Sequence, residues 1–178
     1  AMQNIDIQDF RRKLAYVPQD VFLFSETIRE NIAFGLEDGI ASDEDLQKAV
    51  EAACLLKDVP QWPQGLDTLL GERGVSLSGG QKQRVSVARA LIKKAELYVF
   101  DDCLSAVDAE TERTIIDHLE NWLKNATAVI VSHRIAPLKM ADKIVVLEDG
   151  GVLDIGTHDE LLLRCDYYKN LNESQSTD

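Results

Sequence analysis

Cysteine is scarce in this chain, and it is not arranged for cross-linking. The 178 residues include 3 cysteines, Cys54, Cys103 and Cys165, and none of them belongs to a C-x-x-C pair. An odd number of widely spaced cysteines excludes a disulfide framework and offers no zinc-binding pattern. We therefore expect a protein of a reducing compartment.

Long apolar runs are missing as well. No stretch approaches the roughly 18 consecutive apolar residues of a membrane span, and no signal peptide opens the chain. The composition, 45% apolar and 28% charged, is that of ordinary soluble domains. The sequence therefore predicts a soluble polypeptide that forms one domain over residues 1–172, followed by a disordered tail at 173–178.

Basic residues are outnumbered, since 19 Lys and Arg face 31 Asp and Glu and the net charge is −12. A nucleic-acid backbone attracts clustered Lys and Arg, so this balance argues against nonspecific nucleic-acid binding. It does not exclude a nucleotide, whose charge can be met locally by a metal ion and by helix ends.

The front of the chain predicts a short strand followed by helices. A basic stretch from Arg11 leads into a strand that ends at Val17. We expect Ser25 to cap a short helix and Ser42 to cap a longer one whose first turn is acidic. The segment from Ser25 to about Leu56 is thus predicted to be helical.

After this segment the pattern alternates between helices and strands. A helix ending near Lys94, a strand at 97–100, a helix opened by Asp108 and a strand at 128–131 make a βαβ unit. Such a unit implies parallel strands joined by right-handed crossovers. The fold class that follows is α/β.

The end of the chain predicts a hairpin and one helix. Apolar runs at 144–147 and 152–155 flank the turn sequence 148–151, which contains Asp-Gly. A single last helix is expected at 160–171.

The segment Leu77-Ser78-Gly79-Gly80-Gln81 predicts a binding site for an anion. Ser78 is a good N-cap, and the two glycines let a ligand approach the backbone. The amides of Gly79, Gly80 and Gln81, with the positive end of a helix dipole behind them, suit a phosphate. A lone Ser-Gly-Gly is more often only a turn before an amphipathic helix, so the neighbouring motifs decide.

Polar residues follow both predicted parallel strands. Asp101 and Asp102 come after the strand at 97–100, and His133 follows the strand at 128–131. Ligands of open α/β sheets sit at the carboxyl ends of the strands. Taken alone, an Asp here is more often a cap, and an isolated His is more often structural.

Together these motifs resemble the ATP-binding cassette (ABC) superfamily. Residues 77–81 are similar to its signature motif, and the run 97–101, Leu-Tyr-Val-Phe-Asp, is similar to its Walker B strand. The resemblance covers essentially the whole chain. It implies a P-loop NTPase-like ABC ATPase core with parallel strands, a helical subdomain at about residues 25–90, and ATP and Mg²⁺ as cofactors.

The resemblance also implies roles for single residues. Asp101 would hold the Mg²⁺ that bridges the phosphates, and Gln19 matches the Q-loop residue that reaches this metal or the attacking water. His133 matches the switch histidine at the γ-phosphate. Ser105 and Asp108 match the D-loop that touches an opposite subunit, although a plain helix cap explains Asp108 equally well. The nucleotide-binding residues implied are Leu77, Ser78, Gly79, Gly80, Gln81, Ser105 and Asp108.

The chain departs from the family pattern by lacking one motif. No G-x-x-x-x-G-K-S/T sequence occurs, and this P-loop supplies the amides and the Lys that surround the phosphates. In the family it lies upstream of the Q-loop. We therefore expect the chain to be the C-terminal two-thirds or so of a cassette, with the N-terminal part missing, and to be inactive by itself.

Asp102 is the second departure, because the family usually has Glu there as the catalytic carboxylate. Asp is one methylene shorter, and a general base must reach within about 3 Å of its proton. An Asp at this position resembles the subunit of a heterodimeric exporter that carries the degenerate site. The signature at 77–81 would then complete the competent site of the partner.

Two further stretches resemble exporters, namely 20–35 and Gly71-Glu72-Arg73-Gly74. They imply a second nucleotide-binding domain and the coupling helices of a transmembrane domain as partners, with ATP hydrolysis driving export at the cytoplasmic face of the cell membrane. Two alternatives stay open: a soluble, non-transport ABC ATPase, and a docking module that hydrolyses nothing. His118 and His158 are interpreted as structural.

Overall fold

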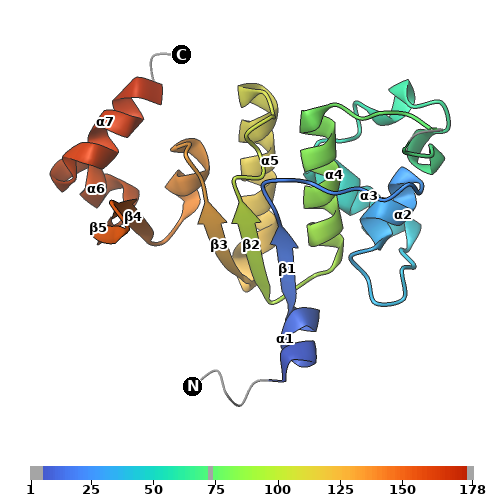
Figure 1. The fold of residues 1–178 in the computed structure, drawn as a ribbon, viewed down its shortest axis with the longest axis horizontal. Helices are drawn as coiled ribbons and strands as arrows, with labels where there is room; N and C mark the ends of the chain where they lie inside the picture. The colour runs from blue at the N-terminus through green and yellow to red at the C-terminus, as the bar shows by residue number, and fades with distance from the viewer. Residues whose placement is uncertain (1–5, 72–73, 176–178) are drawn as a thin grey trace. The chain divides into compact units, whose positions relative to one another are not determined.

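The computed structural model describes residues 6–71 and 74–175. The chain divides between Val131 and Ser132 into two compact units, where the sequence predicted one domain over 1–172. Each unit is described by itself (Figure 1).

The first unit is built on a parallel sheet. Its strands are β1 (Leu14–Val17), β2 (Leu97–Asp101) and β3 (Thr127–Val131), in the order β1-β2-β3. Val17 pairs with Phe100, so the carboxyl ends of these strands lie at one edge of the sheet. The predicted α/β fold with parallel strands is confirmed.

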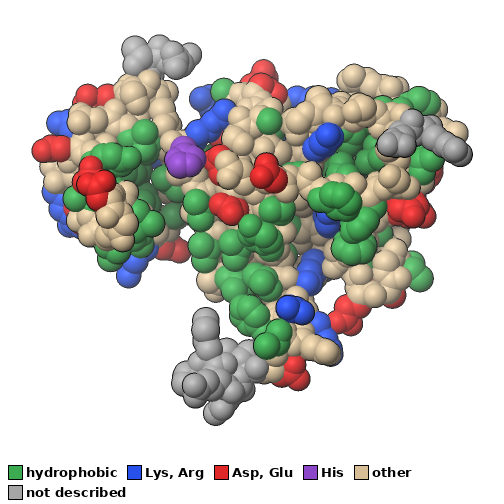
Figure 2. All heavy atoms as spheres, in the orientation of Figure 1, with side chains coloured by type: hydrophobic (Ala, Val, Ile, Leu, Met, Phe, Trp, Pro, Cys, Tyr) green, Lys and Arg blue, Asp and Glu red, His purple; other side chains and the backbone are tan. Residues whose placement is uncertain are grey.

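One face of this sheet is covered and the other is open. Helix α4 (Gly79–Ile92) packs against β1, and Figure 1 shows α5 (Ala109–Trp122) behind the sheet. On the opposite face the register places Tyr16, Val99 and Val129 side by side, and Tyr16 and Val129 are 53% and 48% exposed. Figure 2 shows apolar side chains gathered over the strands on this open face.

The starts of two helices near the N-terminus differ from the prediction. Helix α1 (Ile7–Lys13) occupies the basic stretch expected to lead into the strand, because Asp6 accepts hydrogen bonds from the amides of Gln8 and Asp9. Helix α2 (Ile28–Ala33) is capped by Thr27 rather than by Ser25.

The cap of α2 has a clear physical cause. The Thr27 hydroxyl accepts from the Glu30 amide, and the Glu30 carboxylate accepts from the Thr27 amide, so both groups of a capping box are satisfied. This start also places Ile28 in the core, where it is fully buried.

The rest of the helical segment follows the prediction more closely. Helix α3 (Asp43–Ala52) is capped by Ser42, as expected. Two 3-10 turns, η2 (Val59–Gln61) and η3 (Gly65–Asp67), lead to α4, and another, η4 (Leu123–Asn125), follows α5.

The second unit is a hairpin packed against helices. The strands β4 (Ile144–Glu148) and β5 (Gly151–Gly156) are antiparallel, and positive φ angles of 47° at Asp149 and 77° at Gly150 make the expected tight turn. The turn η5 (Ala136–Met140) precedes the hairpin. The core of this unit consists of Ile135, Ile144, Val146, Leu161, Cys165 and Tyr168.

The last helix is two helices, α6 (His158–Arg164) and α7 (Asp166–Gln175), instead of one. Thr157 caps α6 with a capping box of its own, and the chain is extended at Cys165 (φ −106°, ψ 99°), where the buried side chain joins the core. Residues 173–175, expected in a disordered tail, are helical, and 176–178 lie outside the described residues.

Candidate functional site

The signature segment, residues 77–81, forms the start of α4. The Ser78 hydroxyl accepts from the Gln81 amide at 3.2 Å, and the Gln81 side-chain oxygen accepts from the Ser78 amide at 3.0 Å. The helix therefore begins where the sequence predicted. The Gln81 amide, however, is not free for an anion as expected, because Ser78 already binds it.

Gly79 and Gly80 are left as the amides that can meet a ligand, since the first amides of a helix have no intrahelical acceptor. A Cβ atom on Gly80 would lie 2.8 Å from the carbonyl oxygen of Ala106, whereas one on Gly79 would make only an ordinary contact of 3.4 Å with the Ala106 side chain. Gly80 is thus required by packing on the loop after β2, and Gly79 leaves the approach from solvent open.

Two carboxylates lie at the end of β2, Asp101 as its last residue and Asp102 directly after it. An Asp101 side-chain oxygen accepts from the Tyr16 hydroxyl at 3.1 Å, and this hydrogen bond raises the pKa of Tyr16. Asp102 has a left-handed backbone with a φ of 42°, while its amide donates to the Val131 carbonyl at 2.8 Å. Tyr16 was not predicted as a site residue, because only the register of β1 against β2 places it there.

The loop after Asp102 is held by a residue that the sequence analysis missed. The Gln83 side chain donates to the Ser105 hydroxyl at 3.0 Å and accepts from the Ala106 amide at 2.9 Å. The Ser105 hydroxyl in turn donates to the Asp102 carbonyl at 3.0 Å. Gln83 lies two residues after the signature segment, and this proximity to the motif was the one signal in the sequence that pointed to it.

Asp108 caps α5, as one of its two interpretations required. Its carboxylate accepts from the Thr111 amide at 2.9 Å, and this hydrogen bond lowers the pKa of Asp108. Its expected place at a nucleotide stays a prediction.

Gln19 and His133 fall in different units. Gln19 is exposed and lies just beyond the end of β1, at the sheet edge that carries Asp101. His133 is exposed in the second unit, where its carbonyl accepts from the Gln175 side chain at 2.8 Å. Gln175 also accepts from the Ile135 amide at 2.8 Å, so the supposed tail fixes the loop that carries His133.

The other two histidines make contacts that suit structural roles. His118 Nδ1 lies 3.2 Å from the Ala52 carbonyl oxygen, and His158 Nδ1 lies 2.9 Å from the Tyr168 hydroxyl. Neither contact involves a residue of the candidate site.

A buried ion pair supports the start of α4. Asp58 and Arg84 pair with side chains that are 7% and 8% exposed, and the Gln81 side chain donates to Asp58 at 2.9 Å. Arg84 also donates to the Cys54 carbonyl at 2.6 Å. Gln81 therefore joins the cap of the helix to a charge pair in the interior.

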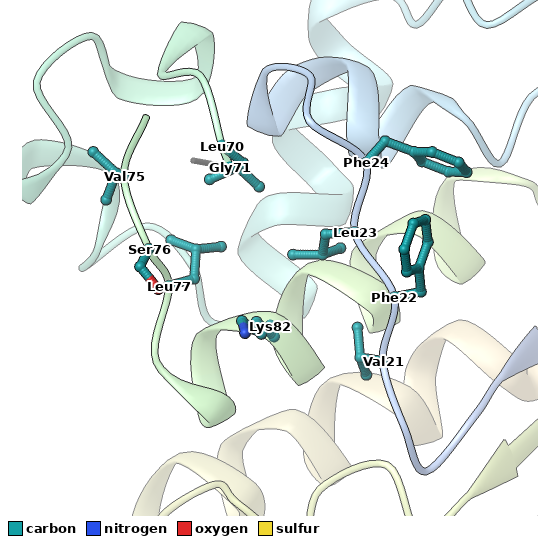
Figure 3. Close-up of a pocket in the computed structure, with 10 residues that line it drawn as sticks. All are labelled: Val21, Phe22, Leu23, Phe24, Leu70, Gly71, Val75, Ser76, Leu77 and Lys82. Atoms are coloured by element: carbon teal, nitrogen blue, oxygen red, sulfur yellow. The ribbon is translucent and has the colours of Figure 1, made fainter. Parts of the chain in front are cut away.

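A groove of about 270 Å³ lies between the segment after Gln19 and the start of α4 (Figure 3). Leu23 points into it, whereas the rings of Phe22 and Phe24 lie on the other side of their segment. Its lining includes Val21, Leu23, Leu70, Val75, Leu77 and Lys82. Gly71 also lines the groove, while Glu72 and Arg73 of the expected exporter loop lie outside the described residues.

Arg89 connects the far end of α4 to the wall of this groove. It donates to the Phe22 carbonyl at 3.0 Å and to the Asn31 carbonyl at 2.7 Å, and its guanidinium lies 5.7 Å from the ring centre of Phe24. Burial lowers the pKa of Arg89. One helix thus carries the signature segment at its start and fixes the groove wall near its end.

The protein family described as ABC transporter matches residues 1–105. The chain belongs to the ABC transporter family. This result confirms the predicted nucleotide-binding domain of that family, while the roles expected for the signature segment and for the end of β2 stay predictions.

The chain is similar in sequence to proteins named as transporters and flippases. The chain is 44% identical over 174 residues to a "Probable multidrug resistance ABC transporter ATP-binding/permease protein" of Bacillus subtilis, covering 98% of this chain and 29% of that protein. It is 42% identical to an "ATP-dependent lipid A-core flippase" of Ralstonia nicotianae, covering 98% of this chain and 30% of the flippase. The chain thus spans about three tenths of the length of these relatives.

A solved structure of a bacterial Atm1-family ABC exporter with ATP bound superimposes with a TM-score of 0.87 at 36% identity. The match covers 96% of this chain and 30% of the exporter chain. It confirms the ABC ATPase core. No helix among residues 6–71 and 74–175 is long and apolar enough to cross a membrane.

The donor set of this ABC domain fits the magnesium that the family uses. Among the described residues no group of three or more His, Cys, Asp or Glu could hold a metal by itself. Mg²⁺ in phosphate-transfer sites is usually bound by one or two carboxylates together with substrate phosphates and waters. Asp101, with Gln19 at the same sheet edge, matches such a partial site.

Proposed function

We propose that this chain is the part of a nucleotide-binding domain that binds and hydrolyses ATP to power export by an ABC transporter. The observation that carries the proposal is the start of α4, where the Ser78 capping box leaves the Gly79 and Gly80 amides for a phosphate. The same unit ends β2 in Asp101, which supplies the carboxylate that a bound metal needs. By itself the 178-residue chain has no P-loop sequence, so we expect it to bind ATP weakly and not to turn it over.

In the complete protein two such domains would face each other with ATP between them. The residues Leu77 to Gln81 would lie at the nucleotide of the opposite domain, and Ser105 and Asp108 would touch that domain. Asp101 and Gln19 would hold Mg²⁺, which neutralises phosphate charge when it is bound. Asp102 and His133 would orient the attacking water and the γ-phosphate.

The groove beside α4 suits a helix of the membrane-spanning part. Its apolar lining can bury an apolar helix face, and Leu77 places that face next to the signature segment. The relatives that are named ATP-binding/permease proteins combine both functions in one chain. We therefore propose coupling helices of a transmembrane domain as the occupant, which puts this domain at the cytoplasmic face of the cell membrane.

Asp102 supports a finer proposal, that this domain carries the degenerate site of a heterodimer. The side chain is one methylene shorter than the Glu usual in the family, and general-base catalysis depends on reach. The intact signature segment would then serve the competent site of the partner.

The deciding experiment uses the complete transporter. Replacing Gly79 with Val narrows the approach to the two amides, so we expect the ATPase rate to fall about 100-fold or more. Photolabelling of this subunit by an azido-ATP should persist, because its own nucleotide is held elsewhere. Gly151→Val is the matched control, since its Cβ would meet nothing closer than 3.7 Å. Loss of label from this subunit alone would contradict the assignment of the signature to the opposite site.

A further inference from the structure

Gln83 has a buried side-chain amide that lies between the signature segment and the loop that follows Asp101 and Asp102. Its residue is 7% exposed, and both ends of its side-chain amide are used, one by the Ser105 hydroxyl and one by the Ala106 backbone. Burial of an amide costs free energy unless its donor and acceptor are satisfied. Here both are satisfied by the loop that follows Asp102.

The contacts form a continuous path from helix to strand end. The Ser105 hydroxyl, which accepts from Gln83, donates in turn to the Asp102 carbonyl at 3.0 Å. The backbone of Gly80 packs directly on Ala106. The start of α4 and the loop 102–107 therefore contact each other at two points. One is the packing of Gly80, and the other is the pair of hydrogen bonds made by Gln83, which depend on direction. A shift of α4 along the loop breaks both of its hydrogen bonds at once.

We infer that Gln83 is a positioning residue that couples the signature segment to the Asp101–Asp102 strand end. The inference rests on the proposed function, in which these two ends serve different ATP molecules: the signature segment faces the nucleotide of the opposite domain, and Asp101 and Asp102 face the domain's own. Gln83 then links the two ATP sites of the assembly within one chain, without touching either nucleotide.

The first test is Gln83→Met in the complete transporter. Met has nearly the same length and volume but makes neither hydrogen bond. The helix should therefore stay packed, while the loop 102–107 is no longer held in a fixed position against it. Misplacement of about 1 Å can cost about 100-fold in rate, so we expect kcat per photolabelled site to fall roughly 10- to 100-fold with KM for ATP unchanged within about twofold. Gln47→Met, on the exposed face of α3, is the matched control and should leave both parameters unchanged.

A double-mutant cycle separates coupling from general loss of structure. Ser105→Ala removes the hydrogen bond to Gln83 from the loop side and leaves the one from the Ala106 amide in place. Because Ser105 is exposed, this variant should fold even if Gln83→Met does not. If Gln83 acts through Ser105, the double variant should lose much less activity than the product of the two single losses. Fully multiplicative losses, an unchanged kcat, or a KM increase with kcat retained would each overturn the inference.

The failure of the proposed function looks different from the failure of this inference. A wild-type assembly that binds ATP but does not hydrolyse it would remove the proposed function itself. A wild-type assembly that hydrolyses ATP, together with a fully active Gln83→Met, would remove only the coupling role of Gln83.

Discussion

Asp102 combines a short side chain with a left-handed backbone. Its φ is 42°, and its amide is held by the Val131 carbonyl, so the backbone fixes the direction in which the carboxylate leaves the chain. Asp and Asn tolerate this conformation better than longer side chains do. The direction of the carboxylate is therefore set largely by the main chain, and a substitution changes its reach more than its direction.

This geometry yields a test of the degenerate-site proposal. In the complete assembly Asp102→Glu should leave turnover equal or higher, because the added methylene extends the reach of the carboxylate. Asp102→Asn preserves the backbone preference and should lower turnover by no more than about twofold, since the base it removes contributes little. Steady-state ATPase rates measure both. A loss of about 100-fold or more in the Asn variant would show a competent general base instead.

Cys103, the next residue, should be chemically silent. It is 5% exposed, and burial raises the pKa of its thiol to about 12. Because the folded-state pKa lies above the ordinary value of 9.0, its contribution to stability is complete below pH 9 and is lost as the pH rises toward 12.

Alkylation with iodoacetamide measures this protection. At pH 8 we expect no labelling of Cys103 in the folded chain and full labelling in urea, read by peptide mass spectrometry. Cys54, which is only half-buried, is the internal control and should label first. Rapid labelling of Cys103 at pH 8 would contradict the buried, neutral thiol.

At the scale of elements, α4 organises the first unit through three polar contacts on its sides. Asp58 holds Arg84 beneath its start, Gln83 reaches the loop after β2, and Arg89 reaches the groove wall. These polar residues alternate with a fully buried apolar stripe that includes Val85, Ala88 and Leu91. The helix is thus fixed in rotation as well as in position.

Removing one partner of the buried ion pair should be costly. Asp58→Ala leaves Arg84 buried without its carboxylate, and we expect a loss of about 3–5 kcal/mol in the free energy of unfolding. Urea unfolding of the chain followed by circular dichroism measures it. Glu44→Ala, which removes the exposed partner of Lys48 on α3, is the control and should give no measurable change. A loss in Asp58→Ala no larger than in this control would show that the pair is not essential.

Helix caps are the features of this fold that could be predicted best from the sequence. Ser42, Ser78 and Asp108 were predicted as caps because each precedes a periodic apolar pattern, and the structure confirms them. The cap of α2 was misplaced at Ser25, whereas the structure has it at Thr27, whose pattern Thr-x-x-Glu is that of a capping box. These signals are local, which is why they could be read from the sequence.

The residues missed by the sequence analysis depend on contacts between distant segments. Tyr16 reaches Asp101 through strand register, and Gln175 reaches the loop of His133 across the second unit. Neither contact leaves a local pattern. The same reason explains the break at Cys165, where burial of the side chain overrides a continuous helical periodicity.

At the scale of the whole molecule, the parallel sheet of this 178-residue chain leaves one face exposed. Parallel sheets are normally covered on both faces, whereas here Tyr16, Val129 and Val131 are about half exposed. Among the described residues β3 also pairs on one side only. An apolar face next to an unpaired edge is a template for association with another chain.

We therefore expect the isolated 178-residue chain to self-associate at micromolar concentration. Val129→Lys and Val131→Lys together should shift it toward the monomer, because charge on an edge strand blocks pairing. Size-exclusion chromatography with light scattering measures the mass. Leu163→Lys, at a residue on α6 that is 89% exposed, is the control and should not change the association. A monomeric wild-type chain would contradict this prediction.

Helix α4 connects the signature segment at its start with the groove wall near its end. Eleven residues separate Ser78 from Arg89, a span of about 16 Å along the axis. If an occupant of the groove displaces Phe22 and Arg89 follows it, a tilt of only about 4° moves Ser78 by about 1 Å. A displacement of that size is enough to put a phosphate out of line for reaction. Under the proposed function, a small displacement at the groove would therefore be enough to change the chemistry at the far end of the helix.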